Sequence, residues 1–421
     1  MQHWLKHNCF AVLITVSVAL SLISCKNQQP SDQQLSNQQC SPIKFENPSQ
    51  GYAAMSRLFA AEDGLYMSWV EQIDSLATLK FAKFDGTNWT KANTIASGTD
   101  WFVNWADFPA IAVNDGNIFA HYLQKSAPDT YTYDIKYKVY NTLNGQWSEG
   151  KKLHTDTTKS EHGFVSVIPY GKGGFMASWL DGRNTVHVPD SLRQMTLRAG
   201  IVNADASLGL QWQLDERVCD CCATSIAQTP DGPMVVYRDR SPDEIRDIYS
   251  VQFKDSLWTQ PKVVYKDDWH INGCPVNGPS ISSGGGVTAV SWFTNANDNP
   301  LVKMTTSKDS GKTYGMPYEL NYMSAVGRVA TVVDSRGWSY TIFMSDDGME
   351  QTWVRLDVED ASQKTIKNTN LFGLSSDRAS GFPQVAVFNQ YLYVSYTNSI
   401  KEKSEVKTLK IPLEQIEFLK E

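Results

Sequence analysis

Short runs in which apolar and polar residues alternate, separated by turn residues, cover most of the chain after about residue 50. One pattern recurs loosely about every 50 residues: two such runs are joined by a tight turn, and an aromatic residue lies near the end of the second run. We count seven copies, at Arg57–Val70, Phe108–Leu123, Gly163–Leu180, Thr224–Tyr237, Gly278–Phe293, Arg328–Phe343 and Phe382–Tyr396. Alternation with a period of two predicts half-buried strands, and self-similarity at this spacing predicts a repeat architecture.

Each repeat predicts a four-stranded antiparallel sheet. The stretches between successive pairs have room for a third and a fourth strand and often contain Trp, at Trp89, Trp147, Trp212 and Trp258. One such sheet cannot cover its own apolar faces, whereas sheets packed around an axis can. We therefore predict an all-β fold, a single β-propeller of seven blades, or of six if one repeat is irregular.

The two ends of the repeat region carry further predictions. The seventh repeat lacks a fourth strand, which Pro42–Asn47 can supply to close the ring. Long helical periodicity is absent, and only Leu413–Leu419 predicts a short helix.

The N-terminus predicts an export signal. Lys6 precedes an apolar run from Cys9 to Ile23, which is short for a membrane span and suited to a signal peptide. The run ends in Leu-Ile-Ser-Cys at Cys25, which resembles the lipobox of bacterial lipoproteins. That resemblance implies cleavage before Cys25 and a lipid on its thiol; an ordinary signal peptide with a chance Cys is the alternative.

We accordingly expect a signal peptide over 1–24, a lipidated Cys25 and a polar tether over 25–40, and the propeller over 41–421. The resemblance places the protein in the cell envelope, held at the membrane by its lipid anchor alone. Lys26 stands where an inner-membrane retention signal would have Asp, which favours the outer membrane, on its periplasmic or surface side.

Charge excludes one class of partner. The formal net charge is -7, and the chain contains no run of Lys and Arg. Nucleic acid is therefore not an expected partner. As a separate expectation, the protein is a monomer.

Propeller geometry places the loops that enter the innermost strands on one face, together with the loops between second and third strands. The tight turns, such as Asp63–Gly64, lie on the opposite face. Polar or reactive residues occupy the entry positions: Arg57, Asp107, Glu161, His162, Cys219, Cys221, Cys222, Cys274, Asn277, Arg328 and Arg378. This ring predicts a ligand site at the mouth of the central channel, a solvated charged rim being the alternative.

The arginines are the candidate ligand-binding residues. Arg57, Arg328 and Arg378 occupy equivalent entry positions, and converging guanidinium groups form a clamp for a carboxylate or phosphate. Arg238 is the fourth candidate, but it belongs to a segment in which Arg and acidic residues alternate over 238–247. Such alternation also fits a structural ion-pair network.

One motif carries a resemblance to a known family. Ser307–Tyr314 reads Ser-Lys-Asp-Ser-Gly-Lys-Thr-Tyr and resembles the Asp box, the BNR repeat of the sialidase superfamily. In that family the box forms a turn between the third and fourth strands, away from the active face. The stretches Tyr237–Tyr249, Cys219–Cys222 and Cys274–Pro279 also resemble bacterial propellers labelled sialidase-like.

The resemblance implies a carbohydrate ligand. Sialidases hold the substrate carboxylate with three Arg and use an Asp as acid and base, with a Tyr nucleophile assisted by Glu. Arg57, in Ser-Arg-Leu, is a counterpart of the family's Arg-Ile-Pro without the Pro. The candidate catalytic residues are Asp107, Glu161 and Asp239. No Tyr matches the nucleophile, so it stays open whether the protein is an enzyme; as an enzyme it would be a glycoside hydrolase of exo-sialidase type.

Seven Cys are present. Cys9 lies in the expected signal peptide and Cys25 is the expected lipidation site, which leaves Cys40 without an expected partner. Cys219, Cys221, Cys222 and Cys274 lie one blade length apart at two neighbouring entries, so we expect four thiols on the same face. In an oxidising envelope they predict two disulfides; the alternative is a thiolate site for copper or zinc, with His162 nearby.

Three functions therefore remain open. The first is a lipid-anchored propeller that binds, or also cleaves, an acidic carbohydrate through its Arg-rich face. The second is a soft-metal or redox site built on the four Cys. The third is a scaffold whose face docks another envelope protein.

Overall fold

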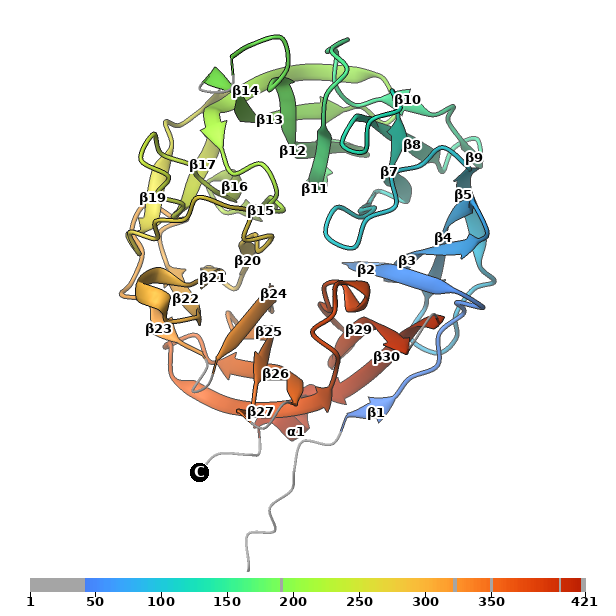
Figure 1. Cartoon of the computed structure of the whole chain (residues 1–421). Coiled ribbons are helices and arrows are strands. Elements are labelled where there is room, and N and C mark those ends of the chain that lie inside the picture. The colour runs from blue at the N-terminus through green and yellow to red at the C-terminus, as the bar shows by residue number, and fades with distance from the viewer. Residues whose placement is uncertain (1–41, 190–191, 321–323, 349–350, 401–402, 418–421) are drawn as a thin grey trace, which may run out of the picture. The chain divides into compact units, whose positions relative to one another are not determined.

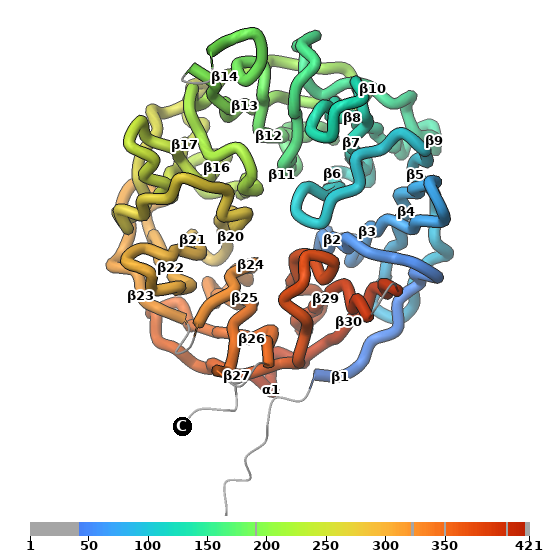
Figure 2. Tube along the Cα trace, viewed as in Figure 1, coloured from blue at the N-terminus to red at the C-terminus, as the bar shows by residue number. Residues whose placement is uncertain are grey.

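The structure is a computed structural model that describes residues 42–189, 192–320, 324–348, 351–400 and 403–417. Seven antiparallel sheets surround a central axis, and each runs outward from an innermost strand (Figure 1; Figure 2). The predicted signal peptide, the lipidation site Cys25, the tether and Cys40 lie outside the described residues. In the described part of the chain, no helix has the length and apolar character needed to span a membrane.

The strands form four concentric sets, with one member or pair in each blade. The innermost strands are β2 (Ala53–Ala61), β6 (Ile111–Asn114), β11 (His162–Tyr170), β15 (Ser225–Thr229), β20 (Ser280–Gly284), β24 (Ala325–Val333) and β28 (Gln384–Phe388). The second strands are β3 (Gly64–Ile73), β7 (Asn117–Lys125), β12 (Gly174–Asn184), β16 (Gly232–Arg238), β21 (Val287–Thr294), β25 (Ser339–Asp346) and β29 (Tyr391–Ile400). The third strands are β4 (Leu76–Phe84), β8 (Tyr133–Asn141), β13 (Gln194–Val202), β17 (Ile248–Lys254), β22 (Leu301–Ser307), β26 (Thr352–Glu359) and β30 (Lys403–Pro412). The outer strands are β5 (Asn93–Gly98), β9 (Gln146–Trp147), β10 (Lys151–Lys152), β14 (Leu208–Val218), β18 (Leu257–Trp258), β19 (Lys262–Tyr265), β23 (Tyr318–Glu319), β27 (Thr365–Gly373) and β1 (Ile43–Lys44).

The predicted architecture is confirmed. Each of the seven expected pairs is an innermost strand joined to a second strand, so the propeller has seven blades and not six. Ring closure also follows the prediction, because β1 pairs with β30, Ile43 lying opposite Lys410. Two blades split the outer strand into short pieces, β9 with β10 and β18 with β19.

The second strands carry the core because a neighbouring blade covers each of their faces. In β21 all eight residues are buried. Trp69, Trp179 and Trp292 occupy the aromatic position of their second strands and are fully buried. Each indole N–H donates to a carboxylate, for example that of Trp69 to Glu71 at 2.8 Å. These bonds let the ring fill the core without leaving its polar atom unpaired.

The Asp box lies between the third strand β22 and the fourth strand β23, as the resemblance implied. The Asp309 carboxylate accepts hydrogen bonds from the backbone N–H and the hydroxyl of Thr313, at 2.8 and 2.6 Å. Lys312 pairs at 2.7 Å with Asp231, in the tight turn between β15 and β16. The box therefore lies on the face of the tight turns, away from the entry loops.

Three short helices complete the described fold: η2 (Ala296–Asp298), η3 (Arg378–Ser380) and α1 (Leu413–Glu417). Helix α1 is the predicted C-terminal helix, as far as the described residues extend. Helix η3 lies in the loop that enters β28 and carries one of the candidate arginines.

Candidate functional site

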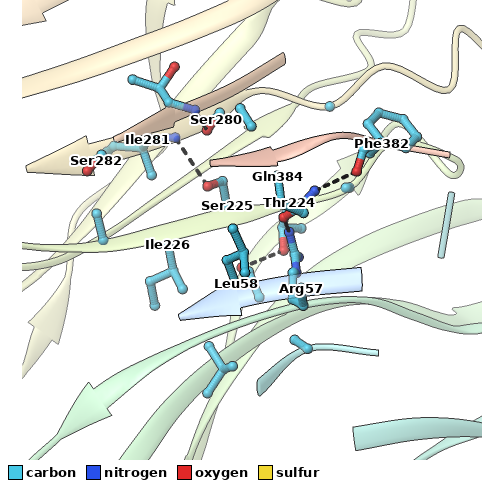
Figure 3. A pocket seen from close by; sticks show the side chains of 18 of the residues that line it. Arg57, Leu58, Thr224, Ser225, Ile226, Ser280, Ile281, Ser282, Phe382 and Gln384 are labelled. Carbon is cyan, nitrogen blue, oxygen red and sulfur yellow. Dashed lines mark hydrogen bonds between the residues drawn. The ribbon is translucent and has the colours of Figure 1, made fainter. Parts of the chain in front are cut away.

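The innermost strands of all seven blades line a central cavity of about 540 Å³. Most of its lining consists of small apolar and hydroxyl-bearing residues, some of which Figure 3 shows from close by. Arg57 and Asp107 are the charged residues of this lining, and they belong to neighbouring blades. Charge is thus confined to one part of the channel wall, where two of the predicted entry residues lie.

Arg57 is fixed within the channel wall. It donates a hydrogen bond from Nη1 to Oε1 of Gln384 at 2.7 Å, which Figure 3 shows, and its guanidinium lies 4.8 Å from the ring centre of Phe108. Burial lowers the pKa of Arg57 to about 10, so the group stays cationic at neutral pH.

An aromatic cluster joins the three candidate arginines. Phe382 stacks on Phe108 and on Trp105, with ring centres 6.2 and 5.6 Å apart. Arg57 lies over Phe108, while the guanidinium groups of Arg328 and Arg378 lie 5.1 and 6.0 Å from the ring of Trp105. The arginines therefore surround an aromatic surface instead of meeting at a single point.

Arg328 and Arg378 differ in what they can offer a ligand. Arg328 is buried and donates to the carbonyl oxygens of Ser376, Asp377 and Gly381, at 2.6 to 3.1 Å. These bonds hold the loop that enters β28, so Arg328 has the contacts of a structural residue. Arg378 is exposed on η3 of the same loop.

Arg238 is also used within the fold. Its side chain is buried and donates to the carbonyl oxygens of Arg246, Asn277 and Phe293, at 2.7 to 3.1 Å. Nearby, Arg240 and Arg246 both form ion pairs with Glu244. The alternating segment is thus an ion-pair network, and the position of Arg238 does not suit the ligand contact expected from the sequence.

Asp107 and Glu161 meet at the hydroxyl of Tyr133, the first residue of β8. This hydroxyl lies 2.9 Å from Oδ2 of Asp107 and 2.7 Å from Oε1 of Glu161. A phenol has one proton to donate, so one of the two carboxyls must itself be protonated and donate to the phenol oxygen. Consistent with this, burial raises the pKa of Asp107 to about 7 and that of Glu161 to about 8.

The position of Asp107 depends on Gly163. The other carboxylate oxygen of Asp107 accepts the backbone N–H of Phe164 at 2.7 Å. A Cβ on Gly163 would lie 1.8 Å from Oδ2 of Asp107, so only Gly leaves room for the carboxyl. Tyr133 itself is fully buried, whereas Glu161 is partly exposed and Asp107 lines the channel. A carboxyl that keeps its proton near neutral pH is a proton donor, and Glu161 is the member that solvent reaches.

Sequence reasoning missed Tyr133, although it named both carboxyl partners. The third candidate, Asp239, belongs to a different group: burial, followed by the charge of Asp215, raises its pKa to about 7. The hydroxyl of Tyr237 donates to Asp215 at 2.5 Å. Asp107 and Glu161 are therefore brought together as one unit, and Asp239 is part of another in a neighbouring blade.

Three of the four thiols meet, and the fourth lies beside one of them, on the face expected from the blade spacing. The Sγ atom of Cys219 lies 3.8 Å from that of Cys221 and 3.4 Å from that of Cys222. Cys274 comes close to Cys221 and Asp220 from the next entry loop. These sulfur separations are longer than the roughly 2.05 Å of a disulfide bond, and all four residues are thiols in the structure.

His162 lies in another cluster. Its ring stacks on that of His154, with centres 3.7 Å apart, and its Nε2 is 3.1 Å from Asp156. Burial, and then the neighbouring His154, lower the pKa of His162. Its contacts are therefore with imidazole and carboxylate groups, which changes the expectation that it accompanies the thiols.

No protein-family model matches the sequence, and neither does any curated protein. Solved structures do match its fold. An ulvan lyase of polysaccharide lyase family PL25, bound to GlcA(1-4)Rha3S, has a TM-score of 0.52 at 10% identity, over 89% of this chain and 95% of that chain. The phage phi92 endosialidase has a TM-score of 0.50 at 10% identity, over 89% and 69%. The chain has a sialidase-like propeller fold.

A protein of unknown function from Dyadobacter fermentans has the same degree of similarity, with a TM-score of 0.50 at 12% identity, over 88% of this chain and 97% of that chain. At such identities the likeness concerns the fold and not the activity. The expectation of a sialidase-like propeller is confirmed on that level.

Proposed function

We propose that the protein binds an acidic carbohydrate at the mouth of the central channel. The observation that carries this proposal is the cluster of Trp105, Phe108 and Phe382, which has the exposed Arg378 at one end and Arg57 in the channel wall at the other. Aromatic faces offer apolar surface to a sugar ring, and guanidinium groups bind carboxylate or sulfate through charge-assisted hydrogen bonds.

The fold neighbours support the ligand class without assigning it. One is an ulvan lyase bound to GlcA(1-4)Rha3S and another is an endosialidase. The names of both refer to acidic saccharides. A cavity of about 540 Å³ beside the aromatic cluster has the size of a small-ligand pocket.

Binding is tested with purified protein on an array of sialylated, uronic-acid and sulfated glycans. Arg378→Ala is expected to weaken binding about tenfold or more, because a hydrogen bond to a charged group contributes about 1.5–3 kcal/mol. The matched control is Lys308→Ala, which removes an exposed cation from the Asp box on the opposite face. An array without acidic hits, or equal binding by both variants, would remove the proposal.

Hydrolysis requires more than binding, namely a proton donor and a nucleophile at the bond that breaks. The Asp107–Tyr133–Glu161 group supplies these residue types, but Tyr133 is fully buried. Binding is therefore the proposed function. Sialic acid released by the wild type and not by Glu161→Gln would extend it to exo-sialidase activity.

The sequence pattern at the N-terminus supports an envelope location for this activity, with a lipid on Cys25 as the membrane anchor. Under this proposal, Cys25→Ala moves the protein from the membrane fraction to the soluble fraction. Mass spectrometry of the wild-type N-terminus should find a diacylglyceryl group. An unmodified Cys25 in membrane-bound protein would contradict the anchor.

A further inference from the structure

We propose that Cys219, Cys221, Cys222 and Cys274 bind one soft metal ion, Zn²⁺ or Cu(I), on the same face as the channel mouth. This site is independent of the proposed carbohydrate site. Both ions have a filled d shell and favour thiolate sulfur, so the donor set selects the pair over hard cations such as Mg²⁺ or Ca²⁺.

Sulfur positions already suit a metal. With a Zn–S bond of about 2.3 Å, a tetrahedral site has sulfur atoms roughly 3.8 Å apart. The separation of Cys219 and Cys221 is 3.8 Å, and that of Cys219 and Cys222 is 3.4 Å. The donor atoms of Cys221, Cys274 and Asp220 lie within 4.8 Å of one another. Cys274 lies beside Cys221, and a movement of its exposed side chain towards Cys219 and Cys222 would make it the fourth ligand.

A buried cation favours the thiolate forms that a metal needs. Nη1 of Arg246 donates to Sγ of Cys219 at 3.2 Å, and Nη2 of the same group pairs with Glu244 at 2.8 Å. A guanidinium in this position also offsets part of the negative charge that several thiolates bring around one ion.

The two loops that carry the thiols are held against each other. Arg238 donates to the carbonyl oxygen of Asn277, in the Cys274 loop, and to that of Arg246, beside the Cys219 loop. Gly278 permits this approach, because a Cβ there would lie 2.1 Å from the carbonyl oxygen of Ala223, directly after Cys222. The loops are positioned by contacts that do not depend on a disulfide.

An ion can enter from the side of Cys274. This residue is exposed, whereas Cys219 and Cys222 are buried. The cluster therefore has a closed base of two buried thiols and opens to solvent at the partly exposed Cys221 and the exposed Cys274, which gives a metal a route to the site.

The test uses the full chain, purified with reductant and stripped of metal, and titrated separately with Zn²⁺ and Cu(I). We expect about one tightly held ion per chain by elemental analysis, with protection of the cluster thiols from alkylation. Substituting Co²⁺ should give the intense charge-transfer absorption of thiolate ligands. The ion that survives dialysis against a competing chelator distinguishes zinc from copper.

Single substitutions test whether the four Cys are the metal ligands. Cys222→Ser and the exposed Cys274→Ser should both lose the ion, and the second should leave the fold intact because its side chain is not in the core. Cys40→Ser is the matched control and should retain binding. Two disulfides among the four Cys in protein isolated without reductant, with no ion held after reduction, would overturn the proposal. So would retention of the ion by Cys274→Ser together with unprotected thiols.

Discussion

Replacing Glu161 with Gln removes one of the two carboxyls that share the hydroxyl of Tyr133 and leaves a side chain of the same shape. In the wild type, burial raises the pKa of Glu161 from 4.5 to about 8. Below pH 4.5 the group is protonated in both the folded and the unfolded chain. As the pH rises towards 8, the unfolded chain releases this proton while the folded chain keeps it, so the free energy of unfolding falls.

The size of this loss follows from the shift. One pKa unit corresponds to about 1.4 kcal/mol, so the full shift would amount to about 5 kcal/mol. Glu161 is partly exposed, and solvent screening reduces the expected value to about 1–2 kcal/mol. Because Gln does not titrate, Glu161→Gln should lack this part of the pH dependence. Its stability relative to the wild type should therefore rise by about 1–2 kcal/mol between pH 4.5 and pH 8.5.

Urea unfolding followed by Trp fluorescence, at half-unit steps from pH 4.5 to 8.5, measures the two curves. The change in slope is the decisive quantity, since a constant offset would reflect only a different hydrogen bond from the amide. Glu149→Gln, at an exposed carboxylate, is the control and should run parallel to the wild type. Parallel curves for Glu161→Gln as well would refute the shared-proton interpretation of Asp107, Tyr133 and Glu161.

Three further substitutions test other contacts. Arg238→Lys keeps the charge but cannot reach three carbonyl groups, and urea unfolding should show a loss of about 3 kcal/mol. Gly278→Ala pushes a methyl group against the carbonyl of Ala223; it should cost about 2 kcal/mol in the same assay and lower metal content. Hydrogen bonds from Thr313 lower the pKa of Asp309 to about 2. The stabilisation that the Asp309 carboxylate gives to the fold is therefore present above pH 4 and is lost as the pH falls towards 2. Asp309→Asn should thus lower the melting temperature at pH 7 and have a smaller effect at pH 3.

The repeat pattern predicted the blades because the relevant information is local. Alternation marks a strand, a Gly-containing turn marks the hairpin, and the spacing marks the next blade. The sequence also predicted that Cys274 would lie beside the Cys219–Cys222 segment, since the two are separated by one blade length at neighbouring entries, and Cys274 is indeed close to Cys221. Position in the repeat is sufficient for such predictions.

Tyr133 could not be predicted by the same means. Its hydroxyl meets Asp107, 26 residues earlier in the chain, and Glu161, 28 residues later. The alternation of apolar and polar residues in β8 does not indicate that its first side chain, that of Tyr133, points to the junction of two blades. The arginines show the same limit: Arg328 and Arg378 occupy equivalent entry positions, but only the fold decides that one faces three carbonyl groups and the other faces solvent.

These structural contacts also have a consequence for binding. Arg238 donates to the carbonyl of Asn277, and the Asn277 side chain accepts the backbone N–H of Arg328 at 2.8 Å. Arg328 in turn holds the loop before β28, which leads to Gln384 and its bond with Arg57. Hydrogen bonds thus connect the entry loops from the fourth blade through the seventh to the first. These loops carry Cys274, the two arginines that lie over Trp105 (Arg328 and Arg378), and Arg57 in the channel wall. Loops fixed in this way would lose little further conformational entropy on binding a ligand, so under the proposed binding function the buried arginines would favour recognition by rigidifying the mouth instead of contacting the ligand.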